Sequence, residues 1–220
     1  MWASRTPQEV VVSLLASVSL PTSPYPPLAV GFFGLGTGYL IYGPQELFGF
    51  PRRRENARGE DIDYGTGVWG LWMPGFMQFI TGTYLFLGLT LFGTFTAKPL
   101  YMAALAFTTY GVHWFALGWN RLRRVDPRVN VGMTVAFTLI SILGIIVFFK
   151  SADAPVGGVF IGLTGVYVTD FFAVLKSDIG RPGELAERAL GFFRIGTGLW
   201  LMYLTFAVVL NFVLNYNLPV

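Results

Sequence analysis

Six apolar stretches alternate with short polar segments along the chain. About 20 consecutive apolar residues form a helix long enough to cross a hydrocarbon core about 30 Å thick. The stretches with about this length are Leu28–Phe48, Val68–Phe92, Pro99–Trp119, Val131–Phe149, Val156–Leu175 and Ala189–Leu214. This pattern predicts an all-α fold, a bundle of six transmembrane helices.

The polar segments combine proline, glycine and charged residues, which is typical of loops. They read "GFPRRRENARGEDID", "GTFTAKP", "NRLRRVDPR", "KSADAP" and "KSDIGRPGELAER". None is long enough for a second domain, so residues 28–220 are predicted to form one membrane domain. In residues 1–27, the stretch "TPQEVVVSLLASVSLP" is too short for a span. We expect an interfacial helix there, with a flexible segment as the alternative.

Composition supports a membrane location. Hydrophobic residues make up 54% of the 220 residues and charged residues only 12%, and the mean hydropathy is +0.58. A soluble domain of this length carries more charge. Lys and Arg concentrate in the first, third and fifth loops, which the positive-inside rule predicts to be cytoplasmic, with both termini outside.

Charge and rare residues restrict the function. The net charge of +3 comes from the loops and suits anionic head groups of the lipid bilayer. The sequence has no basic stripe interleaved with aromatic residues, so we expect no nucleic-acid partner. The chain has no cysteine and one histidine, which leaves few ligands for zinc. It also has no glycine-rich loop of the phosphate-binding kind. We therefore expect no catalytic residue, no metal and no cofactor, and a protein that is not an enzyme.

The dipeptide Thr-Gly recurs in four of the apolar stretches. It occurs at Thr37-Gly38, Thr81-Gly82, Thr164-Gly165 and Thr197-Gly198. Small residues let helix backbones approach closely in lipid, and threonine hydroxyls can bond to their own helix. The pattern predicts helix packing, and the alternative is that some of the hydroxyls also line a polar path.

A polar stripe interrupts the third span, in "AFTTYGVHWFALG" at residues 106–118. Together with "PPLAVGFFGLG" and "GFMQFITG", it resembles the acetate uptake transporter family, also called the succinate-acetate permeases, as a divergent member. The matching residues are Pro26, Pro27, Leu28, Phe33 and Gly34 in the first span, Gln78, Phe79 and Gly82 in the second, and Phe107, Thr109, Tyr110, Gly111 and Trp114 in the third.

The resemblance implies a six-helix protomer in a ring-shaped homo-oligomer, a hexamer, in which each protomer has its own path for acetate and similar small monocarboxylates. It implies an apolar constriction at Phe33, Tyr110 and Leu163. It also implies both termini inside, opposite to the charge count, so the orientation stays open. The location that we expect is the bacterial cytoplasmic (inner) membrane.

Hydroxyl and amide groups at this depth can serve a carboxylate path. Tyr110 and Thr109 can offer hydroxyls to a partly dehydrated carboxylate, while apolar rings exclude larger ions. Gln78 can supply an amide donor at a similar depth. The alternative for Tyr110 and Gln78 is interhelical hydrogen bonding that only holds the bundle together. His113 lies three residues from Tyr110, on nearly the same face, and is either a proton-sensing group or a structural histidine.

Asp170 and Arg194 are predicted to form an intramembrane ion pair. They lie at matching depths in the fifth and sixth spans, and an unpaired charge there is costly. A structural role that locks the two helices is favoured over a role in transport.

Three functions are compatible with these features. The first is a membrane channel or proton-coupled transporter (a symport) for acetate and similar small monocarboxylates. The second is a structural membrane subunit that keeps the family fold inside a larger complex with other membrane subunits. The third is a channel for a small neutral solute such as urea.

Overall fold

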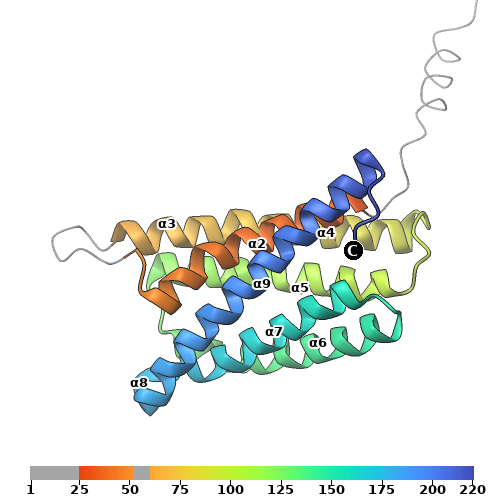
Figure 1. The fold of residues 1–220 in the computed structure, drawn as a ribbon. Helices are drawn as coiled ribbons and strands as arrows, with labels where there is room; N and C mark the ends of the chain where they lie inside the picture. The colour runs from red at the N-terminus through yellow and green to blue at the C-terminus, as the bar shows by residue number, and fades with distance from the viewer. Residues whose placement is uncertain (1–24, 52–59) are drawn as a thin grey trace, which may run out of the picture.

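The computed structural model describes residues 25–51 and 60–220, and this part of the chain is a bundle of long helices (Figure 1). The first helix among the described residues is α2 (Tyr25–Phe48). The predicted segment at residues 1–27 and the cations of the first loop, at positions 52–58, lie mostly outside the described residues.

The second membrane element is a helix interrupted by two π-helical segments. It consists of α3 (Glu60–Gly70), η1 (Leu71–Phe76), α4 (Met77–Phe86) and η2 (Leu87–Leu91). Pro74 lies inside η1, where its missing N–H and its ring disfavour a regular α-helical turn. A wider π turn accommodates such a residue, and π-bulges are frequent at functional sites. The apolar pattern predicted this element but not its interruptions.

The remaining elements follow with short connections. They are α5 (Pro99–Arg123), the 3₁₀ turn η3 (Pro127–Asn130), α6 (Val131–Lys150), α7 (Ala154–Ala173), α8 (Lys176–Ile179) and α9 (Arg181–Leu214). The second and sixth helical elements begin at Glu60 and Arg181, earlier than the predicted Val68 and Ala189. Hydropathy marks the membrane-crossing part of a helix, whereas its polar extension follows from local signals, such as the proline in the first turn of α9.

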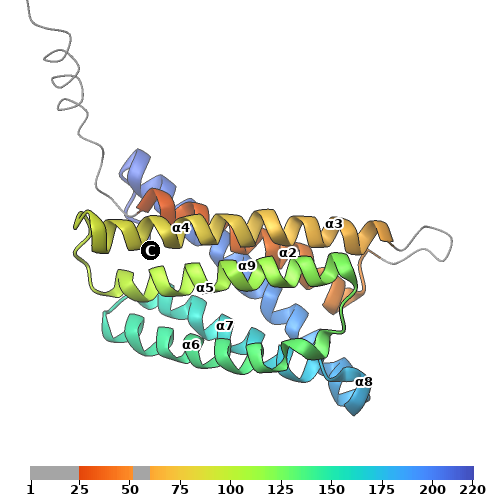
Figure 2. The ribbon, with the colours of Figure 1, turned by 180° about the vertical axis from the view of Figure 1, so that it is seen from behind.

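Within the described residues, four helices are long and apolar enough by themselves to cross a membrane: Pro99–Arg123, Pro127–Lys150, Ala154–Ala173 and Arg181–Leu214. The first element is diluted by glycine and tyrosine, and the second is divided by its π segments. Both nevertheless lie alongside the other four, with α2 packed on α9 and α4 packed on α5 (Figures 1 and 2). The protein is therefore an integral membrane protein, and its described residues form an all-α bundle of six membrane helices.

The bundle has two ends, which are named here by their landmarks. The C-terminal end holds the last residues and the beginning of α2 (Figure 1). The α8 end holds the short helix α8, the end of α2 and the beginning of α3 (Figures 1 and 2). A path across the membrane has to connect these two ends.

Helix contacts explain the Thr-Gly repeats. A Cβ atom placed on the glycine of each repeat would meet a side chain of a neighbouring helix: Pro74 at Gly38, Thr108 at Gly82, Phe193 at Gly165 and Tyr39 at Gly198. In addition, Thr81 donates a hydrogen bond of 2.9 Å to the carbonyl oxygen of Pro27. This confirms the prediction that these residues serve helix packing.

Gly111 gives a direct test of this packing. A Cβ atom there would lie 2.6 Å from the backbone nitrogen of Phe79 and 2.9 Å from the carbonyl oxygen of Gly75. Because neither backbone can move independently of α4 or η1, we expect Gly111→Ala to lower the free energy of unfolding by about 1–3 kcal/mol. At Gly196 a Cβ atom would meet nothing within 4 Å, so Gly196→Ala is the matched control. Melting temperatures in detergent measure both, and equal shifts would contradict the close contact.

Candidate functional site

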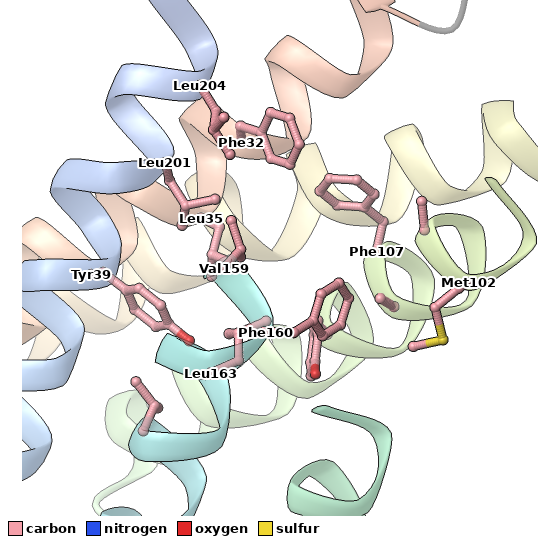
Figure 3. Packing of buried hydrophobic residues seen from close by; sticks show 14 of the residues in the cluster. Phe32, Leu35, Tyr39, Met102, Phe107, Val159, Phe160, Leu163, Leu201 and Leu204 are labelled. Atoms are coloured by element: carbon pink, nitrogen blue, oxygen red, sulfur yellow. The ribbon is translucent and has the colours of Figure 1, made fainter. Parts of the chain in front are cut away.

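An apolar cavity of about 350 Å³ extends from the loops at the C-terminal end into the bundle. Its outer part is lined by Ala97, Ser151 and Asp153 from the loops and by Val220. Its inner part is lined mainly by apolar side chains from α2, α5, α7 and α9 (Figure 3). The cavity therefore lies within one protomer, between the helices.

Gln78 is the one amide side chain that lines this cavity within the described part of the chain. It comes from α4, and its exposed fraction is 1%. Among the residues that the structure describes, neither its Nε2 nor its Oε1 has a hydrogen-bond partner. A buried amide without partners costs about 1–3 kcal/mol, so such a group in a cavity is typical of a binding site rather than of a packing residue.

Tyr110 lies at the inner part of the cavity, and its hydroxyl is already occupied. Its oxygen lies 2.9 Å from Oγ of Ser141 on α6, and Ser141 donates to the carbonyl oxygen of Phe137 at 2.7 Å. Tyr110 is therefore the donor in the first of these bonds. The structure thus shows for this hydroxyl the interhelical bond that the sequence left as an alternative, while the ring of Tyr110 lines the cavity.

An aromatic layer lies at the level of Tyr110. It comprises Tyr110, Phe137, Tyr167 and His113. The ring of Tyr110 stacks on Tyr167 with centroids 5.7 Å apart and an angle of 13°, and Phe137 lies 5.1 Å from Tyr110. The ring of His113 lies 5.0 Å from Phe137. These contacts come from α5, α6 and α7, and they hold the layer together from three sides.

The remaining predicted site residues divide into two groups. Leu163 lines the cavity, together with Gln78 and Tyr110. Thr109 and His113 are not among the lining residues: the hydroxyl of Thr109 donates to the carbonyl oxygen of Leu105 at 2.8 Å within its own helix, and His113 packs in the aromatic layer.

Phe33, which was predicted for the constriction, does not line the cavity. Phe33 is 42% exposed on the outer face of α2, whereas Phe32 is 6% exposed and lines the cavity. The ring of Phe32 lies 5.6 Å from that of Phe107 (Figure 3). One residue along a helix turns a side chain by about 100°, and with two adjacent phenylalanines the sequence motif alone does not decide which one points inward.

The structure gives Arg194 a different ion-pair partner from the predicted Asp170. Arg194 is buried, with a side chain 5% exposed, but the salt bridge runs from its Nη1 to Oε1 of Glu46 on α2. Asp170 is buried within electrostatic range of Arg194, but the two side chains form no direct ion pair among the described residues. The reason is that α9 packs along α2 as well as α7. Glu46 stands inside the predicted first span, and this lone acid was the signal that could have identified it.

Arg121 forms a second polar cluster, closer to the α8 end. Its Nε lies 3.4 Å from Oδ1 of Asp63, and its Nη2 donates to Oε1 of Gln45. Gln45 in turn donates to Oγ1 of Thr66 at 2.8 Å. A shallow hollow of about 350 Å³ lies at this cluster, lined by Asp63, Tyr64 and residues 121–124.

Tyr42 connects the two arginine clusters. The guanidinium carbon of Arg121 lies 4.9 Å from the centroid of its ring, and that of Arg194 lies 5.6 Å away. Cations over an aromatic ring gain about 0.5–2 kcal/mol. From the C-terminal end to the α8 end, the bundle thus contains the apolar cavity, the aromatic layer, a layer formed by Arg194, Trp114 and Tyr39 (the layer of Arg194), and the cluster of Arg121.

Asp153 stands at the outer part of the cavity, in the loop before α7. It caps this helix, because its Oδ1 accepts a hydrogen bond of 3.1 Å from the backbone N–H of Val156. Partial burial raises the pKa of the Asp153 carboxyl, and the hydrogen bond from Val156 opposes this rise. A carboxyl with a raised pKa loses its negative charge at a higher pH than usual, which weakens the repulsion of anions near the cavity as the pH falls.

Comparisons with known proteins give a likeness in fold but no match in sequence. No protein-family model matches the sequence, and no curated protein matches it either. The fold is similar to that of the bacterial acetate channel SatP. The two structures agree with a TM-score of 0.67 at 16% sequence identity, over 88% of this chain and 97% of the SatP chain. At this identity the likeness to SatP establishes the fold, and the function has to be argued from the site.

Proposed function

We propose that the protein conducts acetate and similar small monocarboxylates across the bacterial inner membrane through the cavity. The observation that carries this proposal is the amide of Gln78, which is buried in an apolar cavity without a hydrogen-bond partner among the described residues. A small monocarboxylate has one apolar and one polar end. The apolar walls suit its methyl group, and Nε2 of Gln78 can donate to its carboxylate.

The aromatic layer acts in this proposal as a size filter. The rings of Tyr110 and Tyr167 are packed against each other and against Phe137. A narrow apolar passage rejects large or strongly hydrated ions because these would have to lose their water without compensation. A channel and a proton-coupled symport both use such a passage. The likeness in fold to an acetate channel supports this assignment.

The assembly in this proposal is a hexameric ring in which each protomer has its own path. In this arrangement the walls of each path come mainly from α2, α5, α7 and α9 of one protomer, whose residues line the cavity. The outer faces of the helices carry large exposed apolar side chains, among them Leu139, Phe192 and Phe206, which lipid or neighbouring protomers can cover in a membrane.

A neutral amide such as urea is the second candidate. It is favoured by one feature of Gln78, namely that its acceptor Oε1 is as free as its donor Nε2. A carboxylate uses only the donor, whereas urea can use both. Competition of urea with labelled acetate distinguishes the two substrates.

Substitutions at Tyr110 test the proposed path. We expect Tyr110→Ala to remove the ring from the aromatic layer and to bring the uptake of succinate closer to that of acetate. Tyr110→Phe keeps the ring and loses the bond to Ser141, so the ratio should stay near that of the wild type while the stability falls by about 1 kcal/mol. Uptake ratios in proteoliposomes, at matched amounts of folded protein, measure this. An unchanged ratio in Tyr110→Ala would exclude this ring from the path.

A further inference from the structure

Three buried hydrogen-bond donors remain unpaired in the layer of Arg194. They are Nε of Arg194, Nε1 of Trp114 and the hydroxyl of Tyr39, and none has a hydrogen-bond partner among the described residues. The three side chains belong to α9, α5 and α2, and each is at least nine-tenths buried. Buried donors are nearly always paired in folded proteins, so three in one layer require an explanation.

The three donors belong to side chains that are neighbours. The guanidinium carbon of Arg194 lies 5.9 Å from the ring centroid of Trp114, and the ring of Tyr39 lies 5.9 Å from that of Trp114. The layer lies beyond the aromatic layer, since the ring of His113 contacts that of Trp114 at 5.9 Å. The three side chains are therefore neighbours in a layer that does not line the cavity at the C-terminal end.

The chemistry of the donors identifies the ligand class. A guanidinium, an indole N–H and a phenol all donate hydrogen bonds, and the guanidinium and the indole cannot accept them. Glu46 contacts Nη1 of Arg194, which leaves the Nε edge of the guanidinium open. A carboxylate offers several acceptor positions and a negative charge, and it can meet a guanidinium edge while accepting from a second donor. Water would satisfy the donors but would not use the positive charge.

Two acids in the layer limit the affinity. Glu46 is paired with Arg194, and its Oε2 is buried without a hydrogen-bond partner among the described residues. The carboxyl of Asp170 is buried within electrostatic range of Arg194. An additional anion therefore binds against the repulsion of these carboxyls. Weak binding is what a conducting site needs, because the ion has to leave again.

We propose that Arg194, Trp114 and Tyr39 form a second binding site for a small carboxylate, on the α8 side of the aromatic layer. This rests on the proposed function, since it names a second station for the same substrate. With Gln78 on one side and Arg194 on the other, a carboxylate that passes the aromatic layer finds donors before and after it.

Conservative substitutions test the site. Trp114→Phe and Tyr39→Phe each remove one donor and keep an aromatic ring. Acetate is titrated against each purified protein in detergent, at ionic strength matched with sodium chloride, and the rise in melting temperature gives the affinity. A background of Gln78→Leu removes the donor in the cavity, so that the remaining response reports the second site. Trp119→Phe and Tyr84→Phe, at exposed positions, are the matched controls.

We expect the Gln78→Leu background to keep a response to acetate, and each donor variant to weaken it about tenfold, as the loss of one hydrogen bond to a charged group does. The controls should leave it unchanged. The inference is overturned if the background shows no response to acetate, or if both donor variants respond as it does. If one variant does not fold, the other decides. Failure of the proposed function is a separate result, because it would appear as absent acetate flux in the wild type.

Discussion

Arg194→Ala is expected to destabilise the protein by about 3–5 kcal/mol, because it leaves the carboxyl of Glu46 buried without its partner. The substitution also removes the cation next to the rings of Tyr42 and Trp114. Arg181→Ala is the matched control, since Arg181 lies exposed at the beginning of the same helix, where the loss of a charge changes stability little. Melting curves in detergent compare the two variants.

A double substitution separates the effect of losing the ion pair from the effect of leaving one charge buried alone. In Arg194→Met with Glu46→Gln, neither residue keeps a charge, and we expect a large part of the lost stability to return, since much of the cost of breaking a buried pair is the charge left behind. Equal melting temperatures of the Arg194→Ala and Arg181→Ala proteins would contradict the buried pair.

Gln78→Leu is expected to reduce acetate transport about tenfold or more and, at the same time, to raise stability by about 1 kcal/mol. The transport loss follows from removing the hydrogen-bond donor that the proposed path offers to a carboxylate. The gain in stability follows because the amide has no partner among the described residues, so its burial costs free energy that leucine does not cost.

Gln45→Leu is the control for this pair of effects. The amide of Gln45 accepts from Arg121 and donates to Thr66, so its loss should lower stability. Uptake of labelled acetate into proteoliposomes and melting in detergent measure the two properties. A Gln78→Leu protein that loses stability and keeps wild-type transport would show that Gln78 serves only the bundle.

The apolar pattern was sufficient to predict the helical architecture, because the lipid bilayer requires an apolar stretch in every helix that crosses it. A helix that crosses a bilayer needs a long apolar stretch, so the six elements can be read from the sequence. The π segments and the early beginnings at Glu60 and Arg181 depend on local backbone signals that hydropathy does not contain. The sequence therefore predicts where the helices cross but not how each one is built.

The candidate site was predictable only in part, because a helix face depends on packing. Gln78, Tyr110 and Leu163 line the cavity, whereas Phe33 points outward and Phe32 takes its place. The partner of Arg194 depends on which helices are neighbours, and Glu46 lies far from it in sequence. The pairing of Tyr110 with Ser141 has the same cause: the contact exists only once α5 and α6 are packed.

Flux of labelled acetate into proteoliposomes containing the purified protein tests the central claim most directly. Urea and succinate are added as competitors, and protein-free liposomes give the background from acetic acid that crosses the lipid unaided. We expect uptake clearly faster than this background, inhibited by unlabelled acetate and much less by succinate or urea. Acetate uptake no faster than in protein-free liposomes would contradict the proposal that the cavity is a path for small monocarboxylates.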